Sequence, residues 1–118
     1  MNYLKDFGLT NEDVETIKYS VSDDIYSDLT LFAPLVKKNI EFLRDFGITN
    51  FKRVVIKYPD IFLRDEGSFE NVFSKFDKDD LISKCLNNVA VIKKMVEFVD
   101  KNWVKAYKIN KFYFFIWI

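Results

Sequence analysis

A seven-residue phrase occurs twice in the chain, as LKDFGLT at residues 4–10 and as LRDFGIT at residues 43–49. Residues 3–20 align with residues 42–59 without a gap, and nine of these 18 positions are identical. The two copies are 39 residues apart, and a fixed period of about 20–50 residues is typical of stacked repeat proteins. We therefore expect an all-α fold, a short helical-repeat (solenoid-like) array of about 39-residue units, namely residues 3–41 and 42–87.

Each copy has the order helix, glycine, apolar residue, threonine, helix. Gly8 and Gly47 each follow a helical pattern, and glycine readily adopts the left-handed conformation that ends many helices. Thr10 and Thr49 stand two residues later, where a hydroxyl can cap the next helix. Pro59 disfavours helix at the residue before it and predicts the end of the second copy's second helix. These five residues are the predicted structural turns.

Similar signals predict the remaining helix starts. Thr30, Ser68 and Asp77 are the expected N-caps of the helices that follow them. Gly67 follows a third Leu-(Lys/Arg)-Asp-X phrase, only 20 residues after Gly47, and is either a half-unit turn or a coincidence.

The C-terminal part begins a new amphipathic pattern. Apolar residues from Val89 to Trp103 recur at helical spacing and predict a long helix, followed by an apolar tail, over residues 89–118. The chain has 3 Gly and 2 Pro, and no stretch alternates apolar and polar residues with a period of two. We therefore expect no sheet, and a single domain over residues 1–118.

The second copy combines a Leu-rich helix, a glycine turn, a short helix and a proline followed by apolar residues. The positions that form this phrase are Phe42, Leu43, Gly47, Ile48, Pro59, Ile61, Phe62 and Leu63. The phrase resembles the repeat of the mitochondrial transcription termination factor (mTERF) family, and similar phrases occur in small uncharacterised proteins of AT-rich bacteria. The resemblance implies an all-α solenoid that holds nucleic acid along a basic concave face. Ser20 stands where the first unit would have the proline of this repeat.

The formal net charge is zero, from 18 basic and 18 acidic residues, which disfavours non-specific duplex binding as the main role. The charges nevertheless alternate in blocks: residues 1–30 carry a net −5, residues 31–59 +4, residues 60–80 −4 and residues 81–118 +5. The first basic block could face phosphate groups, pair with acidic blocks of neighbouring units, or simply be solvated. The candidate nucleic-acid-binding residues are Lys37, Lys38, Arg44, Lys52, Arg53 and Lys57.

Few residues suggest catalysis. The chain has no His and one Cys, so it lacks the commonest general base and any Cys/His zinc site. Cys85 lies in an apolar helical pattern and is expected in the core. The carboxylate pairs at 23–24, 65–66 and 79–80 are expected at solvated helix starts and turns. Gly67 stands where a carboxylate nuclease motif would need Lys. We expect no enzyme, no cofactor and no metal site.

The N-terminal stretch lacks the apolar core of a secretory signal, and no run approaches the roughly 20 apolar residues of a membrane helix. We therefore expect a cytoplasmic protein with no integral membrane segment. The tail FYFFIWI carries no charge and would favour aggregation if it were exposed. It is expected to pack as core, to form a homodimer or partner contact, or to be a dispensable end. Its candidate interface residues are Phe112, Phe114, Phe115 and Trp117.

The function expected from these patterns is a non-catalytic macromolecule-binding module of helical-repeat type. Its partner is a protein or a nucleic acid, and the sequence does not choose between them. Two alternatives stay open: a small inhibitor or effector from a mobile element that occludes a host protein, and a carboxylate-dependent nuclease.

Overall fold

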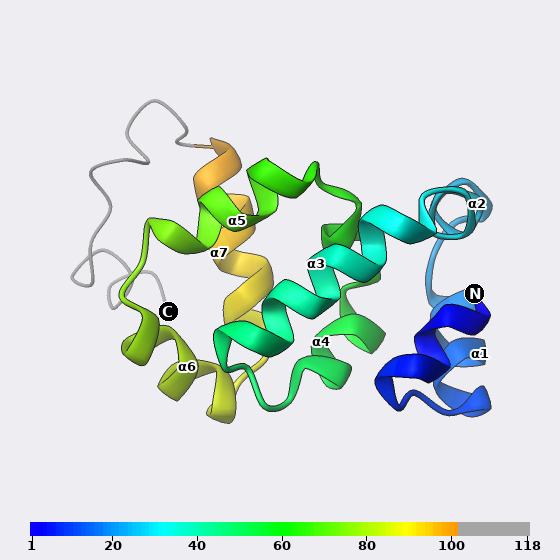
Figure 1. Ribbon diagram of the computed structural model, residues 1–118, viewed down its shortest axis with the longest axis horizontal. Helices are drawn as coiled ribbons and strands as arrows, with labels where there is room; N and C mark the ends of the chain where they lie inside the picture. Colours follow the sequence, from blue (N-terminus) through cyan, green and yellow to red (C-terminus); the bar gives the residue numbers. More distant parts are fainter. Residues whose placement is uncertain (102–118) are drawn as a thin grey trace.

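The computed structural model describes residues 1–101 (Figure 1), and every regular element within them is a helix. The all-α prediction is therefore confirmed for this part of the chain. The predicted interface residues Phe112, Phe114, Phe115 and Trp117 lie outside the described residues. The elements in chain order are η1 (Asn2–Phe7), α1 (Asn11–Ser20), α2 (Asp23–Leu31), α3 (Ala33–Phe46), α4 (Phe51–Lys57), η2 (Pro59–Leu63), α5 (Glu66–Ser74), α6 (Lys78–Asn87) and α7 (Ala90–Lys101).

Helix α3 runs through the middle of the molecule (Figure 1) and contacts η1, α2, α4, η2 and α5. Its buried face carries Val36, Ile40 and Leu43, which share one side of a helix. A second side holds Phe42 and Phe46, whose ring centroids lie 5.4 and 5.2 Å from that of Phe73 in α5. Edge-to-face contacts of this kind stabilise beyond the area they bury. The apolar pattern of residues 35–46 thus places α3 at the core.

The glycine turns of the two copies have the same backbone structure. Gly8 has φ 88° and Gly47 has φ 116°, both in the left-handed region. Gly8 donates to the carbonyl of Lys5 at 3.0 Å, and Leu9 donates to that of Leu4 at 3.4 Å. In the second copy Gly47 donates to Arg44 at 3.1 Å and Ile48 donates to Leu43 at 3.4 Å. Each pair forms a Schellman motif, so both predicted glycine stops are confirmed.

The predicted N-cap is confirmed only in the first copy. The Thr10 hydroxyl accepts from the backbone N–H of Asp13 at 3.1 Å, and the Asp13 carboxylate accepts from the N–H of Thr10 at 2.9 Å. In the second copy α4 begins at Phe51, one residue later than the prediction, so Asn50 is its N-cap. Thr49 is exposed and lies outside the cap position. The prediction for Thr49 is wrong. The second copy has Lys52 where the first has Asp13, so the reciprocal half of the capping box is missing.

Two further cap predictions are wrong. The Thr30 hydroxyl donates to the carbonyl of Tyr26 within α2, and α3 begins after Phe32 with Pro34 in its first turn. Helix α5 begins at Glu66, so Ser68 lies inside its first turn and accepts a hydrogen bond from Arg64. A hydroxyl can bond to a carbonyl inside its own helix, as that of Thr30 does, or to another side chain, as that of Ser68 does, so such residues mark helix starts ambiguously.

The remaining predicted boundaries have mixed outcomes. Helix α4 ends at Lys57 and Pro59 starts η2, as the proline predicted. Asp77 caps α6, also as predicted. Gly67 lies inside α5 without a left-handed φ, so the third glycine is not a turn. Helix α7 covers the start of the predicted C-terminal helix. No helix within residues 1–101 is long and apolar enough to cross a membrane.

Candidate binding site at α4 and the α6–α7 corner

A pocket of about 130 Å³ lies between α4 and the corner that joins α6 to α7. It contains two of the six predicted cationic residues, together with three asparagines and two apolar residues. Its lining residues are Asn50, Arg53, Lys57, Leu86, Asn87, Asn88 and Val89.

The two cations come from one side of α4. Arg53 and Lys57 are one helical turn apart and both are exposed, whereas Val54 and Val55 between them are buried in the core. Arg53 and its neighbour Lys52 occupy the first turn of α4, which has no acidic residue. The positive end of the helix dipole disfavours cations there. Helix stability therefore does not explain the position of Arg53.

The three asparagine side chains of the pocket differ in the hydrogen bonds that hold them. The Asn50 amide donates to the carbonyl of Cys85 at 3.0 Å, which fixes its side chain between α4 and α6. The Asn88 side-chain oxygen accepts from the N–H of Ala90 at 3.0 Å and so caps the start of α7. Asn87 is exposed, and its carboxamide can both donate and accept.

Leu86 adds an apolar contact surface to this polar pocket. Its side chain is 59% exposed, whereas Val89 at the other side of the corner is buried. The arrangement as a whole combines two positive charges, the carboxamide groups of three asparagines and one exposed aliphatic side chain. It suits an anionic group attached to an organic body, such as a phosphate on a nucleotide.

The other predicted cations lie elsewhere. Arg44 pairs with Asp45 (Nε to Oδ1, 3.1 Å) and lies over the ring of Phe7. The side chain of Lys52 covers the Gly8 turn, because a Cβ built on Gly8 would lie 2.7 Å from its Nζ. Lys37 and Lys38 belong to the first half of α3. The structure thus brings Arg53 and Lys57 to one pocket and places the other four at α3 and at the contact with η1.

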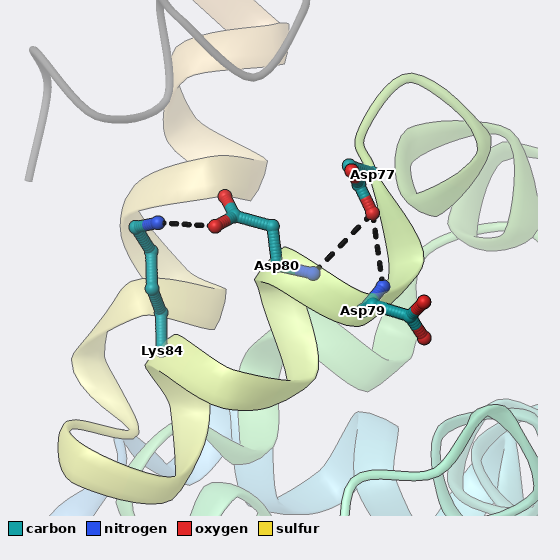
Figure 2. Close-up of polar contacts among 4 residues, drawn as sticks. All are labelled: Asp77, Asp79, Asp80 and Lys84. Carbon is teal, nitrogen blue, oxygen red and sulfur yellow. Dashed lines mark hydrogen bonds and ion pairs between the residues drawn. The ribbon is translucent and has the colours of Figure 1, made fainter.

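The acidic pairs occupy helix starts. Figure 2 shows the Asp77 carboxylate accepting from the backbone N–H groups of Asp79 and Asp80 at 3.0 and 3.3 Å. The Asp80 carboxylate lies 2.6 Å from the Lys84 Nζ one turn along α6. Asp23 and Asp24 lie in the first turn of α2, behind the Ser22 cap. These positions stabilise helices. Within residues 1–101, no three His, Cys, Asp or Glu side chains form a metal-binding group.

Cys85 is buried, as its apolar surroundings predicted. Burial raises the pKa of its thiol from the ordinary value of 9.0 to about 11, and its Sγ lies 3.7 Å from the side-chain oxygen of Asn50. A thiol that stays protonated at neutral pH is a weak nucleophile.

Sequence reasoning missed the asparagines of the pocket. Asn87 and Asn88 interrupt the apolar pattern between α6 and α7, and this polar pair at a helix junction is the signal that marks the corner. Asn50 gives no comparable signal, because only the folded chain brings it to Cys85.

Comparisons with protein-family models, with curated proteins and with solved structures gave no match to this chain.

Proposed function

We propose that this chain is a non-catalytic helical-repeat module that binds a nucleic acid through α4 and the α6–α7 corner. One observation carries the proposal: Arg53 and Lys57 reach the same pocket as the Asn87 and Asn88 side chains. Cations hold phosphate groups and contribute most of the salt-dependent affinity, while carboxamides can form hydrogen bonds with base edges.

The contacts between elements support the repeat part of the proposal. In the two copies η1 corresponds to α3, and α1 corresponds to α4. Element η1 contacts α3, and α1 contacts α4, so corresponding elements pack against each other as stacked repeats do. The two Schellman turns at Gly8 and Gly47 have matching hydrogen bonds. The resemblance of the second copy to mTERF repeats is consistent with this stacking and with nucleic acid as the partner.

The chemistry of the described residues supports a binding role without catalysis. Cys85 is buried and its pKa is raised. Asp77 caps a helix and Asp80 is paired with a lysine. These carboxylates thus already have structural partners and lie outside the pocket.

The test measures binding of a fluorescent oligonucleotide, single-stranded or duplex, by anisotropy at several salt concentrations. We expect the affinity to fall with salt, and Arg53→Glu with Lys57→Glu to weaken binding and to reduce the slope of log K against log salt by about 2 units. The matched control is Lys5→Glu with Lys94→Glu, which makes the same charge change at two exposed positions away from the pocket.

Equal losses in the two double variants would show a general charge effect and no site at α4. Absence of binding by the wild type at low salt would remove nucleic acid as the partner and leave a protein.

A further inference from the structure

The outward face of α2 has a pattern complementary to the pocket. Asp24, Asp28 and Leu31 stand at positions i, i+4 and i+7 and therefore share one side of the helix. Asp24 and Asp28 are exposed and Leu31 is 70% exposed, with Phe32 beside it at 47%. The opposite side of α2 holds the buried Leu29. We call Asp24, Asp28 and Leu31 the α2 stripe.

Helix stability explains only part of this stripe. Asp24 lies in the first turn, where the helix dipole favours an acid, but Asp28 lies in the second half of α2. Two carboxylates one turn apart also repel each other. An exposed leucine beside them adds apolar surface in contact with water. This combination favours a partner that offers two cations and an apolar side chain.

The pocket surface offers these groups. Arg53 and Lys57 are also one turn apart, and Leu86 beside them is 59% exposed. Pairs at i and i+4 have the same spacing of about 5–6 Å on both helices, so the two carboxylates match the two cations in register. Leu31 and Leu86 would supply the apolar contact.

A single molecule does not bring these surfaces together. In Figure 1, α2 lies at the right-hand end of the long axis and α6 lies toward the left, with α4 between them. The described part of the chain extends 39 Å along that axis. The α2 stripe and the pocket therefore lie at different places along the molecule, and each is available to a different molecule.

We propose that the α2 stripe of one molecule docks on the Arg53, Lys57 and Leu86 surface of a second copy of this chain. The contact is heterologous, joining unlike surfaces, so it builds head-to-tail chains unless the rotation closes a ring. It is small and belongs to the weak, transient class of interfaces. Because it uses the same cations as the proposed nucleic-acid site, self-association and nucleic-acid binding compete. The inference itself does not depend on nucleic-acid binding.

The test is sedimentation velocity of the full chain over a concentration series up to about 1 mM, which detects weak contacts, at about 20 mM and about 500 mM salt. The wild type should show a sedimentation coefficient that rises with concentration at low salt, and this rise should be lost at high salt. Asp24→Lys with Asp28→Lys gives two basic surfaces, and Arg53→Glu with Lys57→Glu gives two acidic surfaces. Each variant alone should stay monomeric.

Mixing the two variants is the decisive measurement. Every contact between the unlike variants again joins opposite charges, so the mixture should recover the association of the wild type. Leu31→Ser should weaken association with the charges unchanged. The control Asp6→Lys with Glu70→Lys makes the same charge change at exposed positions outside the stripe, and it should leave association intact. Circular dichroism melting checks the fold of each variant.

Three results would overturn the inference: a wild type that is monomeric at low salt, association that survives in both charge-reversed variants, or a folded mixture that fails to associate. Binding of the labelled oligonucleotide is measured separately, at protein concentrations below those at which the wild type begins to associate. A failure of the proposed function is therefore distinguishable from a failure of self-association.

Discussion

The side chain of Asn50, the N-cap of α4, is joined to the backbone of Cys85 in α6: the Asn50 amide donates to the Cys85 carbonyl at 3.0 Å. Cys85 lies in the last four residues of α6, where a carbonyl has no N–H donor within the helix itself. The side chain of one helix therefore completes the hydrogen bonding at the end of another. This contact also sets the distance between the cations of α4 and the α6–α7 corner.

We expect Asn50→Ala to lower the free energy of unfolding by about 1–3 kcal/mol, because it leaves a half-buried carbonyl without its partner. The substitution should also speed labelling of Cys85 by a thiol reagent, since the buried thiol then opens to solvent more often. Urea denaturation and the labelling rate measure the two effects. Asn87→Ala, at an exposed position in the same pocket, is the control, and equal effects of the two substitutions would contradict the assigned role of Asn50.

Gly47 and Gly67 should respond in opposite directions to substitution by Ala. Gly47 has φ 116°, and a Cβ there would lie 2.8 Å from the Ile82 Cδ1, so Gly47→Ala should cost about 1–2 kcal/mol. Gly67 has no atom within 4 Å of a built Cβ and lies in α5, where Gly67→Ala should stabilise by about 0.5–1 kcal/mol. Thermal and urea denaturation give the signs. A stabilising change at Gly47 would show that its left-handed conformation is not needed.

Asn39 is a buried polar residue on α3, 1% exposed. Its amide donates to the carbonyls of Phe62 at 2.9 Å and of Arg64 at 2.8 Å, and so joins α3 to η2. Asn39→Ala should lower the free energy of unfolding by about 2–4 kcal/mol, because it creates a cavity and removes the partner of two carbonyls. Asn71→Ala, on the exposed side of α5, should change stability by less than about 0.5 kcal/mol. Similar losses at both positions would rule out a special role for Asn39.

The parts of the fold that depend on local chemistry were predictable. A glycine after an apolar helical pattern marked both left-handed turns, because few other residues adopt that conformation. Asp77 and the Thr10–Asp13 capping box marked two helix starts, because their side chains accept hydrogen bonds from backbone N–H groups of the first turn. Thr30, Thr49 and Ser68 failed as caps, because a hydroxyl can also form hydrogen bonds inside a helix and a shift of one residue changes which group becomes the cap.

The candidate site was predictable only in part. The charge block of residues 31–59 contained Arg53 and Lys57, but it also contained Arg44, which pairs with Asp45. Which cations share a surface depends on the path of α6, whose contact with α4 runs through Asn50 and Cys85, 35 residues apart. Contacts over such a separation leave no periodic signal in the sequence, so the place of Asn50 in the pocket appears only in the folded chain.

Two aspartates at the start of α6, Asp77 and Asp80, stabilise the helix through different interactions (Figure 2). Asp77→Ala removes the cap that accepts from two backbone N–H groups and should cost about 1 kcal/mol. Asp80→Asn breaks the ion pair with Lys84. The Asp80 side chain is 10% exposed and that of Lys84 is 16% exposed, so the substitution should lower the free energy of unfolding by about 1–2 kcal/mol. Asp79→Asn, exposed between them, is the control in the same urea denaturation series. A loss at Asp79 as large as at Asp77 would point to helix-dipole effects instead of capping.

The partly buried hydroxyl of Tyr3 should make the stability of the protein depend on pH in the alkaline range. This hydroxyl donates to the carbonyl of Leu29 at 2.6 Å and so joins η1 to α2. Burial raises the pKa of Tyr3 from the ordinary value of 10.0 to about 12. Between these two values the folded state retains a proton that the unfolded state has lost, so the free energy of unfolding falls as pH rises. The contribution is complete below pH 10 and is lost as pH approaches 12.

Tyr3→Phe removes both the hydrogen bond and the titrating group. We expect it to cost about 1 kcal/mol at neutral pH and to lose less stability than the wild type when urea denaturation is repeated at pH values from 10 to 12. Tyr19→Phe, which changes a ring that is 80% exposed, is the matched control at neutral pH. If Tyr3→Phe and the wild type lost stability in parallel over the alkaline range, the Tyr3 hydroxyl would be accessible to water in the folded state, and the link between η1 and α2 would have to be made by other contacts.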